Sequence, residues 1–474
     1  MRAFTFKGLF LTAVFMLLGC LSIQAADDDL ITKQITIKLD KAGTLPDRIT
    51  SSKKYKITNL KIIGEINGTD FRMIREMAGS DYYGGSTEGN LSVLDLSEAK
   101  IVIGGGDCFN GYSCYTSNDV IGNRAFSGCS RLTSLTLPAS ITRIGDDAFC
   151  CCSGLTSLTL PAGITEIGYG AFWGCSGLTS LNLPAGITSI GDDAFYGCSG
   201  LTSITLPAGI TEIGGSAFNG CSRLTSLTLP AGITSIGGGA FYGCSGLTSL
   251  NLPAGITEIG GGAFGFCSGL TSINLPAGIT SIGEYAFYGC SGLTSVTLPA
   301  GITEIGECAF YGCSGLTSVT LPAGLTQIDD YAFSECSGLT SIYVYAEKVP
   351  KIGEYVFTGC DAKKCTVYVP KGTYDDYWLS DFRNYFENIV EFDATGIDKT
   401  TTSTDVKEVS RYSVNGQRLV GPTKGLNIVK YSDGSVKKVA VEIDGSQYLK
   451  SQYLRITNHR VTVRKKHVSL SEYL

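Results

Sequence analysis

The fold is decided by the stretch Leu155-Thr-Ser-Leu-Thr-Leu-Pro-Ala-Gly-Ile-Thr-Glu-Ile-Gly-Tyr-Gly-Ala-Phe-Trp-Gly-Cys-Ser-Gly177. Its 23-residue pattern recurs along more than half of the chain. Three residue types keep strict step with this period. The cysteines are Cys129, Cys152, Cys175, Cys198, Cys221, Cys244, Cys267, Cys290, Cys313 and Cys336. The phenylalanines run from Phe126 to Phe333 and the prolines from Pro138 to Pro322. A fixed period of this length is typical of solenoid proteins.

The chemistry of one unit predicts a strand followed by a turn. Leu155, Leu158 and Leu160 show the L-x-x-L-x-L pattern of a leucine-rich repeat strand, and Pro161 ends that strand because it lacks an N–H group. Further apolar residues follow, the last of them at helical-turn spacing: Ile164, Ile167, Ala171, Phe172 and Cys175. One unit cannot bury these side chains alone, whereas stacked units can. The sequence therefore predicts a β-rich solenoid, a right-handed leucine-rich repeat coil of 23-residue units, with capping segments and a small C-terminal β domain.

The pattern L-x-x-L-x-L-P-x-x-I-x-x-I-G-x-x-A-F-x-x-C resembles the BspA-like (Treponema-type) leucine-rich repeat of surface proteins from Bacteroidetes and other bacteria. The resemblance covers about residues 106–360. It implies an exported or surface-attached protein that adheres to host matrix proteins, epithelium or other bacteria. The family has no shared catalytic residues that could be carried over to this chain.

The repeats lie between segments of different composition. We expect a signal peptide at 1–25, an N-terminal cap at 26–105, repeats at 106–360, a C-terminal cap at 361–394, and a linker with a small β domain at 395–474. Strands are expected at 34–39 and near 60–63, with a last solenoid strand at 367–370. Residues 411–441 are similar to the C-terminal sorting-type β domain of secreted Bacteroidetes proteins. The following 33 residues are expected to form a solvated tail or an extra strand, in preference to a binding patch made by their basic residues: Lys450, Arg455, Arg460, Arg464, Lys465 and Lys466.

The first residues are typical of an export signal. Arg2 and Lys7 precede an apolar run of about 14 residues, which is shorter than the ~20 that a membrane-spanning helix needs. Residues 23–25 offer a cleavage site. Alternatively, Leu17-Leu-Gly-Cys20 is a lipobox that would put a lipidated Cys20 at the mature N-terminus. Both alternatives stay open, and either one takes the protein out of the cytoplasm; no other segment is expected to cross a membrane.

Charge and histidine content exclude several function classes. The chain has 37 basic and 43 acidic residues, a balance that argues against nucleic-acid binding. The only histidines are His459 and His467, so most His-based triads and His-rich metal centres are excluded from the first 458 residues. No cofactor, metal site or catalytic residue is expected.

The cysteines of the repeat are expected to be small core residues, because stacked coils point their Cβ atoms in parallel and no histidine lies near them. If the chain has a disulfide, Cys108 and Cys114, which lie in a loop, are the best candidate pair. The acidic pairs Asp146-Asp147, Asp192-Asp193 and Asp329-Asp330 could bind calcium, although solvated turn residues are the favoured interpretation.

Two repetitive surfaces are candidates for binding. One is a neutral row of Ser, Thr and Asn on the strands. The other is formed by aromatic residues that follow the core phenylalanine, which either pack between coils or anchor a protein or glycan. These are Trp173, Tyr196, Tyr242, Tyr288 and Tyr311.

These features predict a non-enzymatic surface or secreted protein that binds host matrix or surface proteins, or glycans, through a repetitive face. Two alternatives remain. One is an accessory protein of a carbohydrate-active or proteolytic surface system, and the other is a purely structural envelope component.

Overall fold

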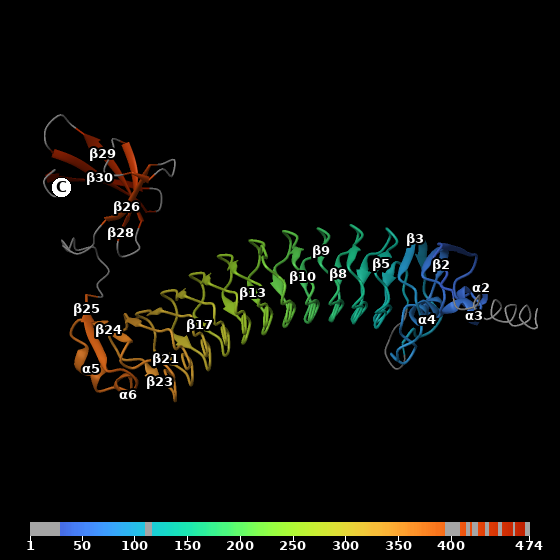
Figure 1. Ribbon diagram of the computed structural model, residues 1–474, viewed down its shortest axis with the longest axis horizontal. Helices are drawn as coiled ribbons and strands as arrows, with labels where there is room; N and C mark the ends of the chain where they lie inside the picture. Colours follow the sequence, from blue (N-terminus) through green and yellow to red (C-terminus); the bar gives the residue numbers. More distant parts are fainter. Residues whose placement is uncertain are drawn as a thin grey trace, which may run out of the picture. The chain divides into compact units, whose positions relative to one another are not determined.

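The computed structural model describes residues 29–109 and 116–393, together with the strands between 408 and 469. The predicted signal peptide, Cys20, Cys114 and the linker up to 407 lie outside the described residues. The chain divides into two compact units, Met1–Ala394 and Thr395–Leu474. In the first unit the coils follow one another in chain order, and their strands pair in parallel (Figure 1). The predicted parallel β-solenoid is confirmed.

Every coil except the one that begins at Leu224 contributes a short strand to one side of the first unit, which we call the strand face. Its middle Leu, Ile or Val is buried, while the flanking Ser, Thr or Asn residues are more exposed, as strand alternation requires. Neighbouring strands pair residues 23 apart, for example Ser249 with Ser272. The strands are β5 (Ser134–Thr136), β7 (Ser157–Thr159), β9 (Ser180–Asn182), β11 (Ser203–Thr205), β14 (Ser249–Asn251), β16 (Ser272–Asn274), β18 (Ser295–Thr297), β20 (Ser318–Leu321) and β22 (Ser341–Val344).

Two-residue strands, each ending on a buried or half-buried isoleucine, form the second side of the coils. They are β4 (Val120–Ile121), β6 (Arg143–Ile144), β8 (Glu166–Ile167), β10 (Ser189–Ile190), β12 (Glu212–Ile213), β13 (Ser235–Ile236), β15 (Glu258–Ile259), β17 (Ser281–Ile282), β19 (Glu304–Ile305), β21 (Gln327–Ile328) and β23 (Lys351–Ile352). Pairing is interrupted between β8 and β10 and between β15 and β17, and on the strand face between β11 and β14.

The third side is the turn edge, which we define as residues 169–174 and their equivalents in the other coils. It consists of turns instead of the helical turn that the sequence spacing suggested. At each step between coils, three backbone N–H groups donate to carbonyl oxygens of the next coil, as from Phe218 to Ala240 at 2.8 Å. This ladder runs without a gap from Arg124 to Thr358. It therefore continues through the places where both sheets are interrupted.

The core is built from stacked columns of identical residues. The Phe218 ring lies 5.3 Å from Phe195 and 5.5 Å from Phe241, with interplanar angles of 6° and 4°. Beside this column, the fully buried Cys221 thiol donates to the Phe195 carbonyl oxygen of the preceding coil at 3.3 Å. The same contact recurs at the other buried ladder cysteines from Cys152 to Cys336. Cysteine therefore serves both as a small core residue and as a donor between coils.

The N-terminal cap closes one end of the core. It contains β1 (Ile35–Leu39), α2 (Leu45–Arg48), α3 (Ser51–Lys54), β2 (Asn59–Ile66), α4 (Gly68–Met77) and β3 (Val93–Ile101). Asn67 and Asp70 form a capping box at the start of α4. At its other end, the buried Arg75 guanidinium donates to the Arg124 carbonyl oxygen at 2.8 Å and to the Ser80 hydroxyl at 3.0 Å. Arg75 thereby ties the cap to the first coil.

The C-terminal cap contains β24 (Thr366–Pro370), α5 (Tyr374–Trp378), α6 (Phe382–Tyr385) and β25 (Asn388–Phe392). The prediction that residues 367–370 form the last solenoid strand is wrong, because β25 pairs in parallel with β24 beyond it. The two short helices return the chain to the sheet edge, a connection with no repeat signal in the sequence. Phe386 lies 5.0 Å from Phe357 and covers the end of the phenylalanine column.

The second unit is a six-stranded antiparallel sheet in the order β27-β26-β28-β29-β30-β31. The strands are β26 (Glu408–Ser413), β27 (Arg418–Leu419), β28 (Gly425–Tyr431), β29 (Val436–Ile443), β30 (Tyr448–Thr457) and β31 (Arg460–Ser469). The segment after Val441 thus completes β29 and forms two further ten-residue strands, so the expected strand is present and is joined by a second one. Its many Lys and Arg residues obscure the apolar alternation by which strands are recognised.

Candidate functional site

The aromatic residues singled out in the sequence lie along the turn edge. Each follows a buried phenylalanine, and its backbone is held by the ladder between coils; the Tyr242 carbonyl oxygen, for example, accepts from Gly220 at 2.7 Å. Because the next residue in most coils is a glycine with positive φ, the chain turns sharply there and leaves the aromatic ring at the surface. Each coil thus places one side chain at the same position on the turn edge.

The five predicted residues fall into two groups. Trp173, which is 37% exposed, has its ring 5.0 Å from that of Tyr196. Asn219 occupies the equivalent position in the next coil and interrupts the row. Tyr288 and Tyr311 then stack at 5.0 Å with an interplanar angle of 7°.

Phe266, which the sequence analysis missed, connects Tyr242 to this second group. Its ring lies 5.3 Å from Tyr242 and 5.1 Å from Tyr288, and its side chain is 44% exposed. We call Tyr242, Phe266, Tyr288 and Tyr311 the aromatic run. Successive ring centroids in the run are 5.0–5.3 Å apart, close to the spacing of stacked strands.

A local exchange of residue order makes the run continuous. Four coils read Tyr-Gly after the core phenylalanine, at 196–197, 242–243, 288–289 and 311–312, whereas this coil reads Gly265-Phe266. A Cβ atom at residue 265 would lie 2.6 Å from the Tyr242 ring, so only glycine fits beside that ring. Phe266 takes the position with positive φ, 54°, where glycine is usual. The reversed Gly-Phe order was the sequence signal for this residue.

Further tyrosines on the same edge precede the core phenylalanine. Tyr285 lies 5.8 Å from Tyr288, and Tyr331 stacks on Tyr355 at 5.1 Å. The Tyr169 hydroxyl donates to an Asp193 carboxylate oxygen at 2.6 Å, and this hydrogen bond raises the pKa of Tyr169 to about 12. These tyrosines do not stand at the position after phenylalanine from which the candidate binding residues were predicted.

The electrostatic surroundings of the aromatic run are acidic. Residues 224–347 contain eight acidic residues and no Lys, Arg or His. The Tyr285 hydroxyl donates to Glu307 at 3.2 Å, and the neighbouring Cys308 and Glu307 raise the pKa of Tyr285 to about 12. The Tyr285 hydroxyl therefore stays neutral over the physiological pH range, and the carboxylates near the run would repel a polyanion.

The strand face offers hydroxyl and amide groups in regular rows. At its C-terminal end aromatic residues replace them: Tyr343 stacks on Tyr368 at 4.6 Å, and Phe392 lies 6.0 Å from Tyr343. These residues pack against each other at the C-terminal cap and belong to strands β22, β24 and β25.

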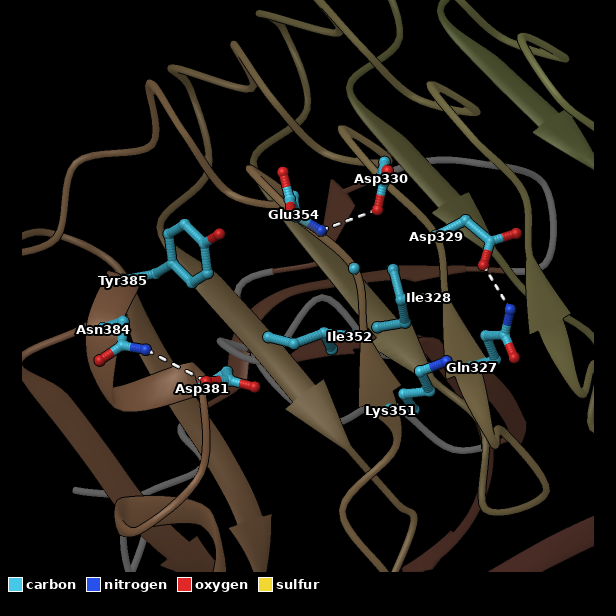
Figure 2. A pocket seen from close by; sticks show the side chains of 11 residues that line it. Gln327, Ile328, Asp329, Asp330, Lys351, Ile352, Glu354, Asp381, Asn384 and Tyr385 are labelled. Carbon is cyan, nitrogen blue, oxygen red and sulfur yellow. Dashed lines mark hydrogen bonds between the residues drawn. The ribbon is translucent and has the colours of Figure 1, made fainter.

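A hollow of about 440 Å³ lies where the last coils meet the C-terminal cap (Figure 2). Three of the four carboxylates that line it accept hydrogen bonds within the protein. Asp330 accepts from the Glu354 backbone at 2.8 Å, Asp329 from the Gln327 side chain, and Asp381 from Asn384 at 3.2 Å. Among the described residues, no group of three or more His, Cys, Asp or Glu side chains could hold a metal ion.

The acidic pairs have the same structural role elsewhere. Asp146 accepts from the Tyr169 backbone at 3.0 Å and Asp192 from Gly215 at 2.6 Å. Asp146 and Asp192, the first residues of their pairs, and Asp330, the second residue of its pair, thus each accept from a backbone N–H group of the next coil and help to join the coils.

The ladder cysteines from Cys129 to Cys336 are all buried and free. Burial raises the pKa of Cys129 to about 11 and that of Cys244 and Cys290 to about 12, so these thiols stay protonated. Cys108 is disulfide-bonded, whereas Cys114, its expected partner, lies outside the described residues.

Comparison with known proteins identifies the repeat. The sequence matches the family described as BspA type leucine rich repeat region (6 copies) over residues 119–248, 173–294 and 262–372, which together span more than half of the chain. No curated protein matches it. In the described part of the chain, no helix is long and apolar enough to span a membrane.

Solved structures of leucine-rich repeat proteins are similar to the chain. One from Bacteroides ovatus is 28% identical with a TM-score of 0.50, covering 71% of this chain and 84% of its own. One from T. pallidum is 32% identical with a TM-score of 0.33, covering 34% and 77%. A leucine rich cell surface protein from Faecalibacterium prausnitzii is 26% identical with a TM-score of 0.35, covering 66% and 87%.

Proposed function

The chain belongs to the BspA type leucine-rich repeat family, and on that premise we propose that it is a non-enzymatic surface or secreted protein that adheres to an extended partner along its turn edge. Four aromatic residues in register carry this proposal. Tyr242, Phe266, Tyr288 and Tyr311 present rings 5.0–5.3 Å apart on one surface, and such rings bind proteins and sugars at low cost in side-chain entropy.

The ordered backbone under the run supports this role. Each of these residues donates its backbone N–H within its own coil or to the next one, for example Phe266 to the Tyr288 carbonyl oxygen at 2.5 Å. The rings are therefore held on an ordered backbone, so the loss of conformational entropy when a partner binds is small.

The acidic character of residues 224–347 narrows the partner class. A sulfated polysaccharide or a nucleic acid would meet carboxylates without a compensating cation on these coils. Neutral glycans, and host matrix or surface proteins with neutral or basic segments, fit the surface better. We propose these as partners.

The location follows from the family and from the N-terminal segment. Proteins with this repeat are cell-surface proteins, and residues 1–25 carry the export pattern described above. We propose that the protein is exported to the cell surface or secreted, and that Cys20 carries a lipid if the lipobox is used. An accessory role in a glycan-degrading or proteolytic system, or a structural role in the envelope, is the alternative.

A screen and a variant series test the adhesion proposal. An array of host matrix proteins and neutral glycans first identifies a ligand, and surface plasmon resonance then compares variants. Tyr288→Ala should weaken binding only a few-fold, because neighbouring rings still contact the partner. Deletion of residues 224–315, four whole units that hold the entire run, should cost ~10²–10⁴-fold, because multivalent contact is lost.

Asn219→Ala is the matched control, since it occupies the same position in a coil without an aromatic ring, and it should leave binding unchanged. Circular dichroism verifies that each variant remains folded. If one substitution abolishes binding while the four-unit deletion leaves it intact, the site is local and the multivalent proposal is wrong.

A further inference from the structure

Two adjacent cysteines on the turn edge form a pair of thiols outside the core ladder. Cys151 is exposed and Cys150 is partly exposed, both are free, and their sulfur atoms lie 3.5 Å apart. The third cysteine of this run, Cys152, belongs to the buried ladder and donates to Phe126. Cys150 and Cys151 therefore have no part in the packing that accounts for the other repeat cysteines.

The backbone at Cys151 is strained in a way that the repeat normally avoids. Its φ is 59°, in the left-handed region that favours glycine. The equivalent residue is a non-glycine with positive φ in two other coils, Phe266 and Glu335, and glycine with positive φ in eight: Gly128, Gly174, Gly197, Gly220, Gly243, Gly289, Gly312 and Gly359. Placing a cysteine there costs roughly 1 kcal/mol. Strain of this kind is a sign of function when the side chain itself is needed.

The geometry favours a common ligand over a bond between the two sulfurs. Adjacent Cα atoms across a trans peptide are ~3.8 Å apart, shorter than the ~4.4–6.8 Å of ordinary disulfides. By contrast, two thiolates each ~2.3 Å from one soft centre and 3.5 Å apart subtend an angle of roughly 100°, close to the tetrahedral value.

We propose that Cys150 and Cys151 form a dithiolate site for a soft, thiophilic centre, either trivalent arsenic or a d¹⁰ metal cation. With an organic arsenic(III) oxide, two As–S bonds form and the As–O bonds break, while the oxygen leaves as water with the two thiol protons. With a cation, two metal–sulfur bonds replace bound water and two protons pass to the solvent. No oxidation state changes in either case.

The surroundings make the site distinct from other thiols of the chain. The Cys151 backbone N–H donates to the Trp173 carbonyl oxygen at 2.6 Å, so one of the two tryptophans lies in the neighbouring coil.

The test uses the folded full chain after mild reduction, with phenylarsine oxide and Cd²⁺ as separate probes. Native mass spectrometry and quenching of tryptophan fluorescence report binding. Cys151→Gly and Cys150→Tyr place at each position the residue that other coils hold there, so both variants should fold. Either one should lower affinity by ~10²–10⁴-fold, because a chelate becomes a single contact. Cys308→Ser, which removes another turn-edge thiol, is the matched control and should bind like the wild type.

Binding of either probe that needs both thiols supports the proposal, and the two probes separate an arsenical from a metal cation. The proposal is overturned if neither probe binds the folded chain, or if wild-type affinity survives in either Cys150→Tyr or Cys151→Gly. It stands independently of the proposed adhesion, since neither probe reports on a host ligand.

Discussion

Deletion of residues 201–223 should leave a folded protein, whereas deletion of residues 201–211 should abolish the cooperative melting of the solenoid. The first change removes one complete unit and joins Gly200 to Leu224, which reproduces the natural Gly200–Leu201 junction. The Phe195 backbone, which donates to Ala217 at 2.8 Å, then meets Ala240 in the equivalent position. Neighbouring coils present the same surfaces, so stacking is restored.

The shorter deletion removes half a unit. The affected coil loses its strand and the buried residues Leu201, Ile204 and Leu206, while the following turn edge stays attached out of phase. Thermal melts followed by circular dichroism compare the two variants with the wild type. The 23-residue deletion should melt within a few degrees of the wild type and the 11-residue deletion far below it. Equal melting of the two variants would refute the stacking of coils as the source of stability.

Cys221→Asp should destabilise the protein by several kcal/mol, the largest effect expected of a single substitution. Cys221 is fully buried, and its thiol donates to the Phe195 carbonyl oxygen. A carboxylate there would face that carbonyl and the apolar column without a donor, so burial would raise the pKa of the new carboxyl group. Cys221→Ser keeps a donor of similar size and is the matched control; it should cost much less.

The pH dependence of the Asp variant follows from the same burial. A carboxyl group whose pKa is raised in the folded state is bound to its proton more tightly there than in the unfolded chain. Its contribution to the free energy of unfolding is therefore most favourable below the unfolded-state pKa of ~3.9. That contribution is lost as the pH rises through the folded-state pKa. Denaturant titrations at pH 4 and pH 7 should show a smaller deficit relative to the wild type at pH 4. The interpretation fails if Cys221→Asp is no less stable than Cys221→Ser at neutral pH.

The coil itself could be predicted because its period is constant. Leucine spacing, a proline after each strand and the phenylalanine and cysteine columns all follow from the requirement that stacked units bury the same faces. The C-terminal cap could not be predicted as well, because β25 comes after two short helices that do not continue the period. In the second unit, residues 448–469 are too rich in charge for their strands to be recognised.

The candidate site, too, could be predicted only in part from the sequence. Trp173 and the four tyrosines could be found by their fixed place after phenylalanine, but the interruption at Asn219 divides them into two groups. Phe266 escaped detection because it stands one residue later, where the repeat expects glycine. Its place in the run depends on how the Tyr242 ring covers Gly265, a contact between side chain and backbone that the repeat pattern does not contain.

Because the hydrogen-bond ladder of the turn edge is unbroken, the coils should resist separation more strongly along this edge than along the other two sides. Three backbone hydrogen bonds join every pair of coils there, while the sheets on the other two sides are interrupted at different coils. When the solenoid bends under load, the coils should fan apart on the interrupted sides and keep their distance along the turn edge. The rings on that edge should then keep a constant spacing. A ligand bound across several of them should therefore keep its contacts while the rest of the solenoid bends.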